Sequence, residues 1–258
     1  MSYKTLELTS RNAVVIGGTS GIGLTIAKGL AEAGAKVIAT GRRTNLVEAA
    51  ADEIRRAGSK SLAVPSDVGD SASIEGVLQA AIREWGGVDI LVNSAGITKR
   101  APTLDVPLSD WNAILDTNLS GTLRSCQIFG RHMIARNYGR IINIGSIASM
   151  LALYEVTAYC ASKAAVAALT KSLAIEWARY GVCVNAILPG VFRTDMNAKL
   201  LDGTARGAEF LQRTPMGRFG RLEELVGAAV FLASEAASFV TGHLLAVDGG
   251  ILASGVNQ

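Results

Sequence analysis

Short apolar runs rich in β-branched residues alternate with longer, Ala-rich amphipathic stretches along the whole of the 258-residue chain. The short runs have no polar side, which is typical of strands in a parallel sheet that helices cover on both faces. No shift in composition and no Ser- or Pro-rich linker divides the chain. The pattern therefore predicts a single doubly wound α/β domain over residues 1–258, with about seven parallel strands and helices on both faces. The expected strands are residues 12–17, 36–40, 61–65, 88–92, 140–145, 182–188 and 244–247, and the expected helices are residues 21–33, 44–57, 71–85, 109–137, 157–180 and 222–234.

Composition and charge exclude several other classes of protein. Apolar residues make up 49% of the chain and charged residues 18%, which is the composition of a globular chain and not of a disordered one. The net charge of +3 is too small to indicate a nucleic-acid partner. The only histidines are His132 and His243, so we expect no metal site. The N-terminal residues lack a signal-peptide core and no apolar run is long enough to span a membrane, so we expect a cytoplasmic protein with no membrane partner.

One segment interrupts the alternation. Residues 190–221 are too many for an ordinary connection between a strand and a helix, and they hold five glycines and a proline, with short helical patches such as residues 196–201. Long connections in compact domains are commonly lids or binding loops. We therefore expect a substrate-binding loop or lid here, the alternative being a surface excursion without a role.

A glycine-rich turn lies between the first expected strand and the first expected helix. Its spacing, Gly17-x₃-Gly21-x-Gly23, is neither G-x-G-x-x-G nor the G-x₄-G-K-[ST] of nucleotide triphosphatases. Glycines at this place let the backbone approach a phosphate, whose charge then meets the helix N-terminus. The position after the first strand predicts a dinucleotide site in a Rossmann-type domain, the alternative being a purely structural turn.

The residues after the second expected strand bear on the choice of cofactor. An NAD site often places Asp or Glu there, whereas a 2′-phosphate is matched by Arg. Here the strand ends in Thr40-Gly41-Arg42-Arg43, without an acid. Arg42 therefore predicts NADP, with NAD as the alternative cofactor and two solvated arginines as the alternative structural explanation.

A candidate acid–base pair occurs in the sequence Tyr159-Cys160-Ala161-Ser162-Lys163. Residues four apart share one face of a helix, and a cation beside a phenol lowers its pKa. Ser146 follows an expected strand, at the sheet edge where doubly wound domains place their sites, and its hydroxyl could hold a substrate oxygen. Asn118 is a polar residue in an otherwise apolar helical stretch.

Taken together, these features resemble the short-chain dehydrogenase/reductase family, and the resemblance covers essentially the whole chain. The matching motifs are Ile16–Gly23, Asn93-Ser94-Ala95-Gly96, Asn118, Ser146, Tyr159 with Lys163, and Pro189-Gly190. The chain departs from the family at Ile16, at Ser94 and at Gly145, where the family usually has Thr, Asn and Ser. These departures leave the acid–base residues intact.

The resemblance implies a role for each matching residue. Tyr159 would donate a proton to the carbonyl oxygen, Ser146 would hydrogen-bond that oxygen, and Lys163 would lower the Tyr159 pKa and hold the nicotinamide ribose. Asn118 would position the waters that return protons to Lys163. Together with Arg42, the implied cofactor-binding set is Gly17, Thr19, Ser20, Gly21, Ile22, Gly23, Asp67, Val68, Asn93, Ala95, Gly96, Tyr159, Lys163, Pro189, Gly190, Val191 and Thr194.

Within the family, residues 97–102 and 214–250 look most like gluconate 5-dehydrogenases, which implies a sugar acid or a related polyol as the small-molecule substrate. Lys99 and Arg100 follow an expected strand, where a cation could pair with the carboxylate of a sugar acid, or could merely form a solvated basic corner. Glu155, four residues before Tyr159, would repel a carboxylate unless it hydrogen-bonds the hydroxyls of a neutral polyol. The expected substrate residues are therefore Lys99, Arg100, Ser146 and Glu155.

Two other functions fit the same residues. A 3-oxoacyl-carrier-protein reductase would need a basic docking patch, for which Arg124, Arg131 and Arg136 are candidates. A non-catalytic dinucleotide sensor would be expected to lack the Tyr or the Lys, and neither is lost. Helices as long as those expected at 109–137 and 157–180 pair between subunits in the family, so we expect a homo-oligomer, a tetramer.

Overall fold

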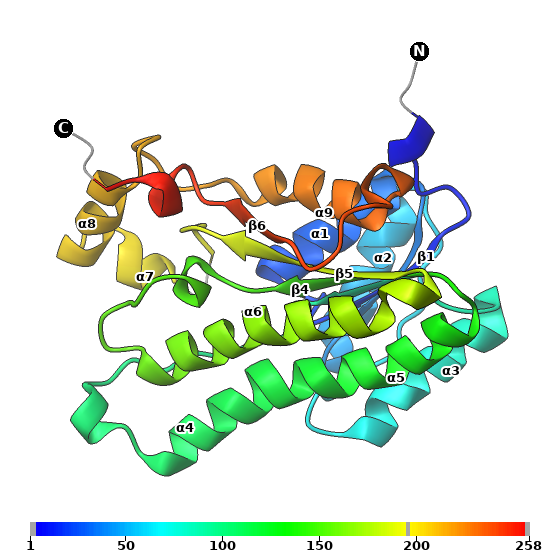
Figure 1. Cartoon of the computed structure of the whole chain (residues 1–258), viewed down its shortest axis with the longest axis horizontal. Coiled ribbons are helices and arrows are strands. Elements are labelled where there is room, and N and C mark those ends of the chain that lie inside the picture. The colour runs from blue at the N-terminus through cyan, green and yellow to red at the C-terminus, as the bar shows by residue number, and fades with distance from the viewer. Residues whose placement is uncertain (1–3, 195–196, 256–258) are drawn as a thin grey trace.

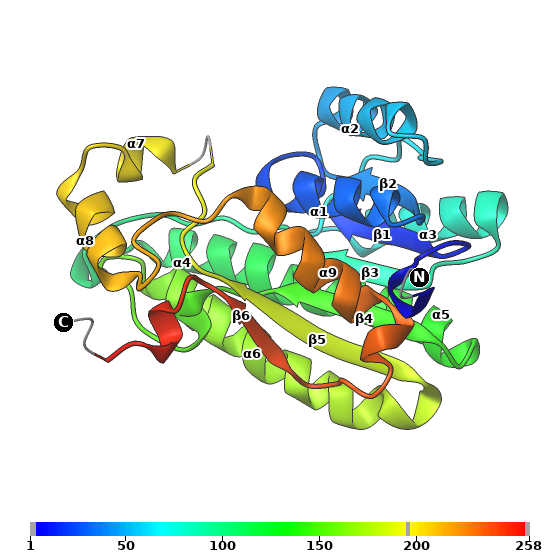
Figure 2. The same ribbon diagram turned by 90° about the horizontal axis from the view of Figure 1, so that it is seen from above.

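Six parallel strands form the centre of the molecule, in the order β2-β1-β3-β4-β5-β6 (Figures 1 and 2). The structure, a computed structural model, describes residues 4–194 and 197–255. The strands are β1 (Asn12–Ile16), β2 (Lys36–Thr40), β3 (Ile90–Asn93), β4 (Gly139–Ile144), β5 (Val182–Pro189) and β6 (Leu244–Val247). The strand order confirms the predicted doubly wound Rossmann-type α/β fold, because the chain leaves β1 on one side for β2 and returns on the other side for β3.

The expected strand at residues 61–65 is wrong, since this segment is extended but does not join the ladder. It runs beside β2 and is hydrogen-bonded to that edge only at its ends, from Val37 N to Lys60 O and from Ser66 N to Gly41 O. Between these bonds, the Val64 carbonyl accepts a hydrogen bond from the Thr40 hydroxyl and not from a backbone N–H of β2. The sheet therefore has six strands in the described part of the chain and not seven.

Helices cover both faces of the sheet, as predicted (Figure 2). One face carries α1 (Gly21–Glu32), α2 (Thr44–Arg56) and α9 (Val226–Ala233), and the other carries α3 (Ser71–Trp85), α4 (Leu108–Leu115), α5 (Gly121–Ala135) and α6 (Thr157–Trp177). Side chains of β1 alternate between the two cores: Ala13 and Val15 pack toward α1 and α9, while Val14 and Ile16 pack toward α3, α5 and α6. This alternation explains why the strands show no polar side in the sequence.

Three of the expected helices are each divided into two or more parts. Residues 109–137 form α4, a π-helical turn η3 (Asp116–Ser120) and α5. Residues 157–180 form α6 and a 3₁₀ turn, η5 (Ala178–Tyr180), while residues 222–234 form a 3₁₀ turn, η6 (Leu222–Leu225), and α9. The remaining 3₁₀ turns are η1 (Lys4–Leu6), η2 (Thr103–Asp105), η4 (Ile147–Ser149), η7 (Glu235–Ala237) and η8 (Ile251–Ala253).

The long connection after β5 holds two short helices, α7 (Ala198–Leu201) and α8 (Ala205–Arg213), which stand at one end of the sheet, beyond the carboxyl end of β5 (Figure 2). The expected helical patch at residues 196–201 corresponds to α7, and its first residue lies outside the described part of the chain. None of the helices that the structure describes is long and apolar enough to cross a membrane.

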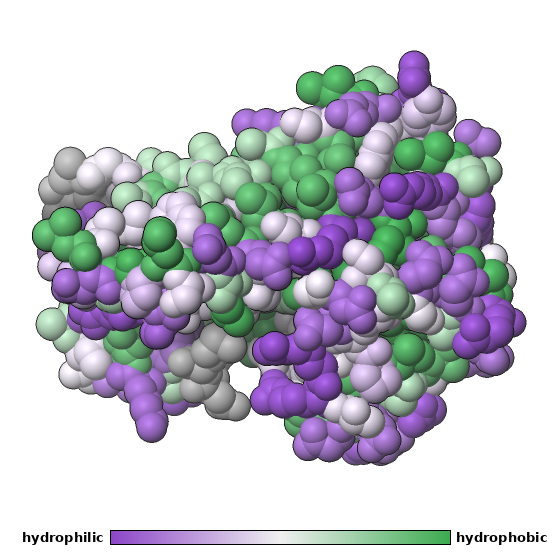
Figure 3. Space-filling model, turned by 90° about the horizontal axis from the view of Figure 1, so that it is seen from below, coloured by the Kyte–Doolittle hydropathy of each residue, from purple (hydrophilic) through white to green (hydrophobic). Residues whose placement is uncertain are grey.

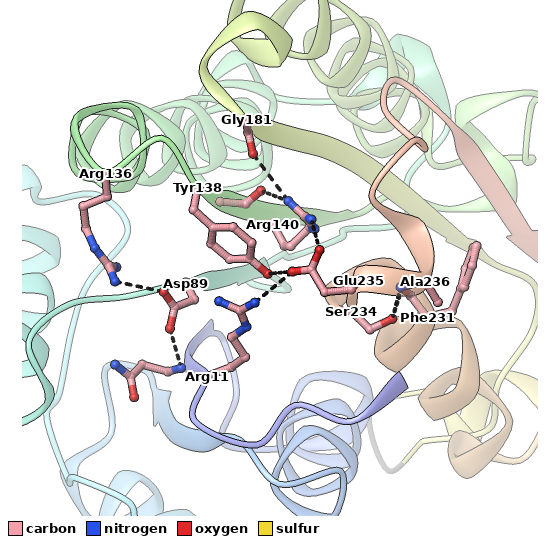
Figure 4. A network of polar contacts seen from close by, with 12 residues as sticks. Arg11, Asp89, Arg136, Tyr138, Arg140, Gly181, Phe231, Ser234, Glu235 and Ala236 are labelled. Atoms are coloured by element: carbon pink, nitrogen blue, oxygen red, sulfur yellow. Dashed lines mark hydrogen bonds and ion pairs between the residues drawn. The ribbon is translucent and has the colours of Figure 1, made fainter. Parts of the chain in front are cut away.

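The opposite, amino edge of the sheet is fixed by a polar network (Figure 4). Glu235 accepts hydrogen bonds from Arg11 at 2.8 Å, from the Tyr138 hydroxyl at 2.9 Å and from Arg140 at 3.3 Å. The guanidinium groups of Arg11 and Arg140 lie 4.1 and 4.6 Å from the centre of the Tyr138 ring. The network ties the segment before β1 to the start of β4 and to the turn after α9, and it leaves the carboxyl edge of the sheet for the loops described next.

Candidate active site

The glycine loop packs directly against the loop that follows β3. Gly17 has φ +76°, and a Cβ atom there would lie 2.5 Å from the backbone N of Ala95, so only glycine fits. The backbone N–H groups of Gly17 and Gly18 both donate to Thr40 O at the end of β2. The loop is thus held between the carboxyl ends of β2 and β3, at the point where the strand order reverses.

The start of α1 is open to a ligand. Gly21 has φ +49°, and a Cβ atom there would meet only Thr194 Cγ2, at 3.7 Å. Ser20, the N-cap residue, makes no side-chain cap hydrogen bond. A helix N-terminus without a protein cap attracts a phosphate oxygen, because its N–H groups and the helix dipole favour negative charge.

The segment after β5 lies across this loop. Thr194, which is close to Gly21, is fixed by a hydrogen bond from its backbone N to Asn197 Oδ1 at 2.8 Å. Gly190 lies against Asp248, whose Cα would be 2.6 Å from a Cβ at position 190. Of the predicted residues, Pro189, Gly190 and Val191 thus lie at the carboxyl end of β5, and Thr194 lies beside the glycine loop.

Arg42 is exposed. It lies beside the glycine loop, because a Cβ atom built on the preceding residue, Gly41, would be 3.2 Å from Thr19 Oγ1. Arg42 has no carboxylate partner among residues 4–194 and 197–255. Asp67 and Val68 lie in the turn that follows the extended segment beside β2, where Asp67 Oδ1 accepts a hydrogen bond from Gly69 N. These positions are compatible with the predicted cofactor-binding roles of Arg42, Asp67 and Val68.

Asn93 points into the protein and away from the loops. It is 4% exposed, and its Nδ2 donates to Asn143 Oδ1 at 2.9 Å and to Cys126 Sγ at 3.3 Å. Its Oδ1 is buried with no hydrogen-bond partner among the described residues. The side chain therefore joins β3 to β4.

Ser146, Tyr159 and Lys163 come together at the carboxyl edge. Ser146 follows β4 and is near enough to the Tyr159 side chain to lower its pKa, and the Lys163 ammonium lies 5.7 Å from the centre of the Tyr159 ring. Lys163 is 5% exposed and donates to Ile144 O at 2.7 Å. At Gly145, where the family usually has Ser, a Cβ atom would lie 2.4 Å from Leu188 Cδ2, so a larger residue would need the Leu188 side chain to move.

The net shift of the Tyr159 pKa is upward, against the expected lowering, and Lys163 is not among the causes of this shift. Burial raises the pKa of Tyr159 above its ordinary 10.0, and the hydrogen bond from Ser146 only partly offsets this rise. The Lys163 ammonium faces the ring and the Ile144 carbonyl, and burial lowers the pKa of Lys163 to about 8. The phenol is thus held in its protonated form at neutral pH.

Asn118 lies in the π-helical turn η3 and is completely buried. Its side-chain amide accepts from Ile97 N at 2.8 Å and donates to Ile97 O and Ser162 Oγ, each at 3.0 Å. Both Asn118 and Lys163 lie against Gly96, where a Cβ atom would be 3.3 Å from Asn118 Oδ1 and 3.7 Å from Lys163 Nζ. The amide therefore clamps the exit of β3 to α6, next to Lys163.

The two predicted substrate cations are already paired. Lys99 Nζ lies 2.6 Å from Asp110, and Arg100 Nε lies 2.5 Å from Glu155 Oε2. The expected repulsion between Glu155 and an acid substrate is consequently reduced, because the Arg100 charge compensates it. Lys99 and Arg100 are also less available to a carboxylate than the sequence suggested.

Sequence reasoning missed three residues that shape this region. Ser162 holds Asn118, and its position between Tyr159 and Lys163 was the available signal. Asp110 pairs with Lys99, a contact that nothing in the local sequence reveals. Arg206 of α8 donates to the carbonyl of Tyr154, and the two residues belong to segments that are far apart in the chain.

The basic patch expected for a carrier-protein reductase is largely occupied by the chain itself. Arg124 binds Val68 O and Asp116, and Arg136 binds Val88 O and Asp89. Within the described residues there is also no group of three or more His, Cys, Asp or Glu side chains that could hold a metal ion. The geometry favours acid–base chemistry on a small molecule beside a phosphate-binding loop.

Comparison with known proteins agrees with this geometry. A family model described as Enoyl-(Acyl carrier protein) reductase matches residues 17–252. The chain is 42% identical to the gluconate 5-dehydrogenase of Gluconobacter oxydans over 98% of this chain and all of the relative. It is 41% identical to the D-threitol dehydrogenase of Mycolicibacterium smegmatis over 95% of this chain and 94% of that one.

Among solved structures, a gluconate 5-dehydrogenase from Burkholderia cenocepacia, in complex with NADP and tartrate, superposes with a TM-score of 0.94. The two chains are 41% identical, and the match covers 98% of this chain and 99% of the other.

Proposed function

The chain belongs to the short-chain dehydrogenase/reductase family, and from this premise we propose that it interconverts a secondary alcohol and a ketone with NADP(H). The substrate we propose is a sugar acid, with gluconate and 5-ketogluconate as the model pair. The observation that carries the reaction class is the grouping of Ser146 and Tyr159 beside the buried Lys163, whose ammonium lies 5.7 Å from the centre of the Tyr159 ring, at the carboxyl edge of the sheet. Near-complete matches to sugar-acid and polyol dehydrogenases support the substrate class.

The described residues fit a bound dinucleotide phosphate. The uncapped start of α1 beside Gly21 offers backbone N–H groups to the pyrophosphate, and the exposed Arg42 is placed to bind a 2′-phosphate. The absence of an acid after β2 and the NADP complex of a 41% identical neighbour support NADP over NAD. When bound, the nicotinamide supplies or accepts the hydride.

The protein's own part in ketone reduction is proton transfer and orientation. Tyr159, protonated at neutral pH, donates its hydroxyl proton to the ketone oxygen. Ser146 hydrogen-bonds the same oxygen and fixes its distance from the phenol. Lys163 stabilises the phenolate that forms, and Asn118 keeps the loop after β3 and the start of α6 at a fixed separation.

A neutral polyol is the second candidate substrate. Because Lys99 pairs with Asp110 and Arg100 with Glu155, neither cation is free to bind an acid substrate. A D-threitol dehydrogenase is also 41% identical to this chain. A neutral hydroxyl-rich substrate would accept and donate hydrogen bonds at these pairs without needing a spare charge.

The test is oxidation of NADPH and NADH, measured side by side, with 5-ketogluconate and with erythrulose as the neutral ketose. We expect faster turnover with NADPH and 5-ketogluconate than with any other combination. Turnover of erythrulose alone would replace the sugar acid by the polyol. Turnover with NADH at the same efficiency would contradict the role of Arg42.

A further inference from the structure

The cations around the carboxyl edge differ in whether they have an acidic partner. Arg100 pairs with Glu155, Arg193 with Asp202, and Arg218 with Glu224. Arg206, on α8, has no carboxylate within ion-pair distance in the described part of the chain. Its charge is therefore not neutralised by the protein in the way that its neighbours are.

The hydrogen bonds of Arg206 are also incomplete. Both terminal nitrogens, Nη1 and Nη2, donate to one neutral acceptor, the carbonyl oxygen of Tyr154, at 3.1 Å each. Its Nε is buried and has no hydrogen-bond partner among the described residues. A guanidinium carries five N–H donors in a planar fork that matches the two oxygens of a carboxylate. One carbonyl oxygen is a poor substitute for such a partner.

The position of Arg206 is set by the segment that it contacts. Tyr154 lies between Ser146 and Tyr159 in sequence, and the next residue, Glu155, forms the ion pair with Arg100. Arg206 thus reaches from α8 to the loop between Ser146, which orients the substrate oxygen, and Tyr159, the proposed proton donor. Arg100 compensates the charge of Glu155, whereas Arg206 has no acidic partner at this loop among the described residues.

We propose that Arg206 binds the carboxylate of the acid substrate, exchanging the Tyr154 carbonyl for two carboxylate oxygens. This inference rests on the proposed sugar-acid reductase activity, and it makes Arg206 the residue that distinguishes an acid from a neutral polyol. Loss of a bidentate, charge-assisted pair reduces affinity by about tenfold or more.

The test compares Arg206→Gln with Arg213→Gln, an exposed arginine on the same helix that pairs with Glu209. In the NADPH-loaded enzyme we expect Arg206→Gln to raise KM for 5-ketogluconate by about tenfold or more, with little change in kcat or in KM for NADPH. KM for erythrulose should stay the same, and Arg213→Gln should behave as the unmodified protein. Arg206→Lys, which keeps the charge but not the fork, should raise KM less than Arg206→Gln and serves if the latter does not fold.

The outcomes separate this inference from the proposed function. Normal reduction of 5-ketogluconate with an unchanged KM in Arg206→Gln would overturn the inference and leave the function standing. An equal rise in KM for 5-ketogluconate and for erythrulose would also overturn it, since that is the effect of a structural strap between α8 and the loop. If the unmodified protein reduces erythrulose but not 5-ketogluconate, the sugar-acid function and the inference both fail.

Discussion

Tyr159 illustrates how a single environment fixes the protonation state of a residue. The burial that positions the phenol beside Ser146 also raises its pKa above 10.0, and the Lys163 ammonium lies over the ring and not at the hydroxyl. The protonated phenol is the form that ketone reduction requires, whereas alcohol oxidation requires the phenolate.

The two directions should therefore respond oppositely to pH. We expect kcat/KM for reduction to stay level from about pH 6 to 7, because Tyr159 remains protonated and Lys163 keeps its charge. Above about pH 8 it should decrease, because Lys163 loses the charge that stabilises the phenolate. Alcohol oxidation should increase with pH between about 6 and 7, because the phenolate fraction increases about tenfold per pH unit below the pKa. A fall in reductive kcat/KM between about pH 6 and 7 would show that Tyr159 titrates near neutral pH and contradict this assignment.

Arg42 should determine the preference for NADPH. We expect Arg42→Ala to raise KM for NADPH by about tenfold or more and to leave KM for NADH nearly unchanged, because only NADPH carries the 2′-phosphate. Arg56→Ala, at the far end of α2, is the control. Parallel losses with both cofactors would show that Arg42 supports the loop and does not read the phosphate.

The sequence predicts those contacts between site residues that depend on the local geometry of one helix or one strand end. The spacing of Tyr159 and Lys163 and the place of Ser146 after a strand were sufficient to bring these residues together. The pairing of Lys99 with Asp110 and the contact of Arg206 with Tyr154 were not predictable, because they join segments whose relative position depends on the whole fold.

Among the elements, the π-helical turn η3 carries the most information about function. Its apolar periodicity resembles that of a continuous helix, so the expected helix at residues 109–137 gave no sign of it. A π-helical turn contains one more residue than an α-helical turn and often occurs at functional sites. Here it is the turn that carries the buried Asn118 against Ile97 and Ser162.

Deleting Thr117 should convert η3 to a regular α-helical turn. Such a deletion rotates Asn118 and α5 by about 100° relative to α4, so Asn118 loses its contacts with Ile97 and Ser162 if α4 keeps its place. We expect turnover to be lost while NADPH binding and far-ultraviolet circular dichroism are retained, and Asn118→Ala is the comparison without a shift. Full turnover in the deletion variant would show that the position of Asn118 does not matter.

The segment at residues 61–65 shows the opposite limit. Its composition is that of a strand and it lies beside β2. Regular pairing, however, depends on whether its carbonyl oxygens accept hydrogen bonds from the backbone or from side chains. The Thr40 hydroxyl donates a hydrogen bond to the Val64 carbonyl. The pattern of residues within the segment gives no indication of this contact.

In the whole molecule, the carboxyl and amino edges of the sheet, where the parallel strands end and begin, serve different purposes: one for function and one for stability. The carboxyl edge carries the proposed site, and the amino edge is fixed by Glu235 with Arg11, Tyr138 and Arg140 (Figure 4). Arg140 is 4% exposed, so removal of its acid partner leaves a buried charge less well compensated.

Glu235→Ala should lower the free energy of unfolding by about 1–3 kcal/mol without changing kcat for reduction. Denaturation in urea measures this, with Glu84→Ala on the exposed side of α3 as the control. A loss of activity in the folded variant would show that the network also acts on the carboxyl edge.

We propose that the face formed by α4, α5 and α6 takes part in self-association. On this face, hydrophobic side chains are interspersed with hydrophilic ones (Figure 3), and Ile175 of α6 is 82% exposed. Multi-angle light scattering should give the mass of a tetramer, and Ile175→Asp should reduce it. A monomer mass for the unmodified protein would contradict this proposal.

The central claim is that hydride passes between the nicotinamide and the carbonyl carbon of a sugar acid while Tyr159 supplies the proton. The most direct test uses NADPH carrying deuterium at both C4 positions, with 5-ketogluconate as acceptor and mass spectrometry of the product. We expect gluconate that is heavier by one deuterium, with formation reduced by a factor of about 10² to 10⁴ in Tyr159→Phe. Unlabelled gluconate, or undiminished formation in Tyr159→Phe, would contradict this mechanism.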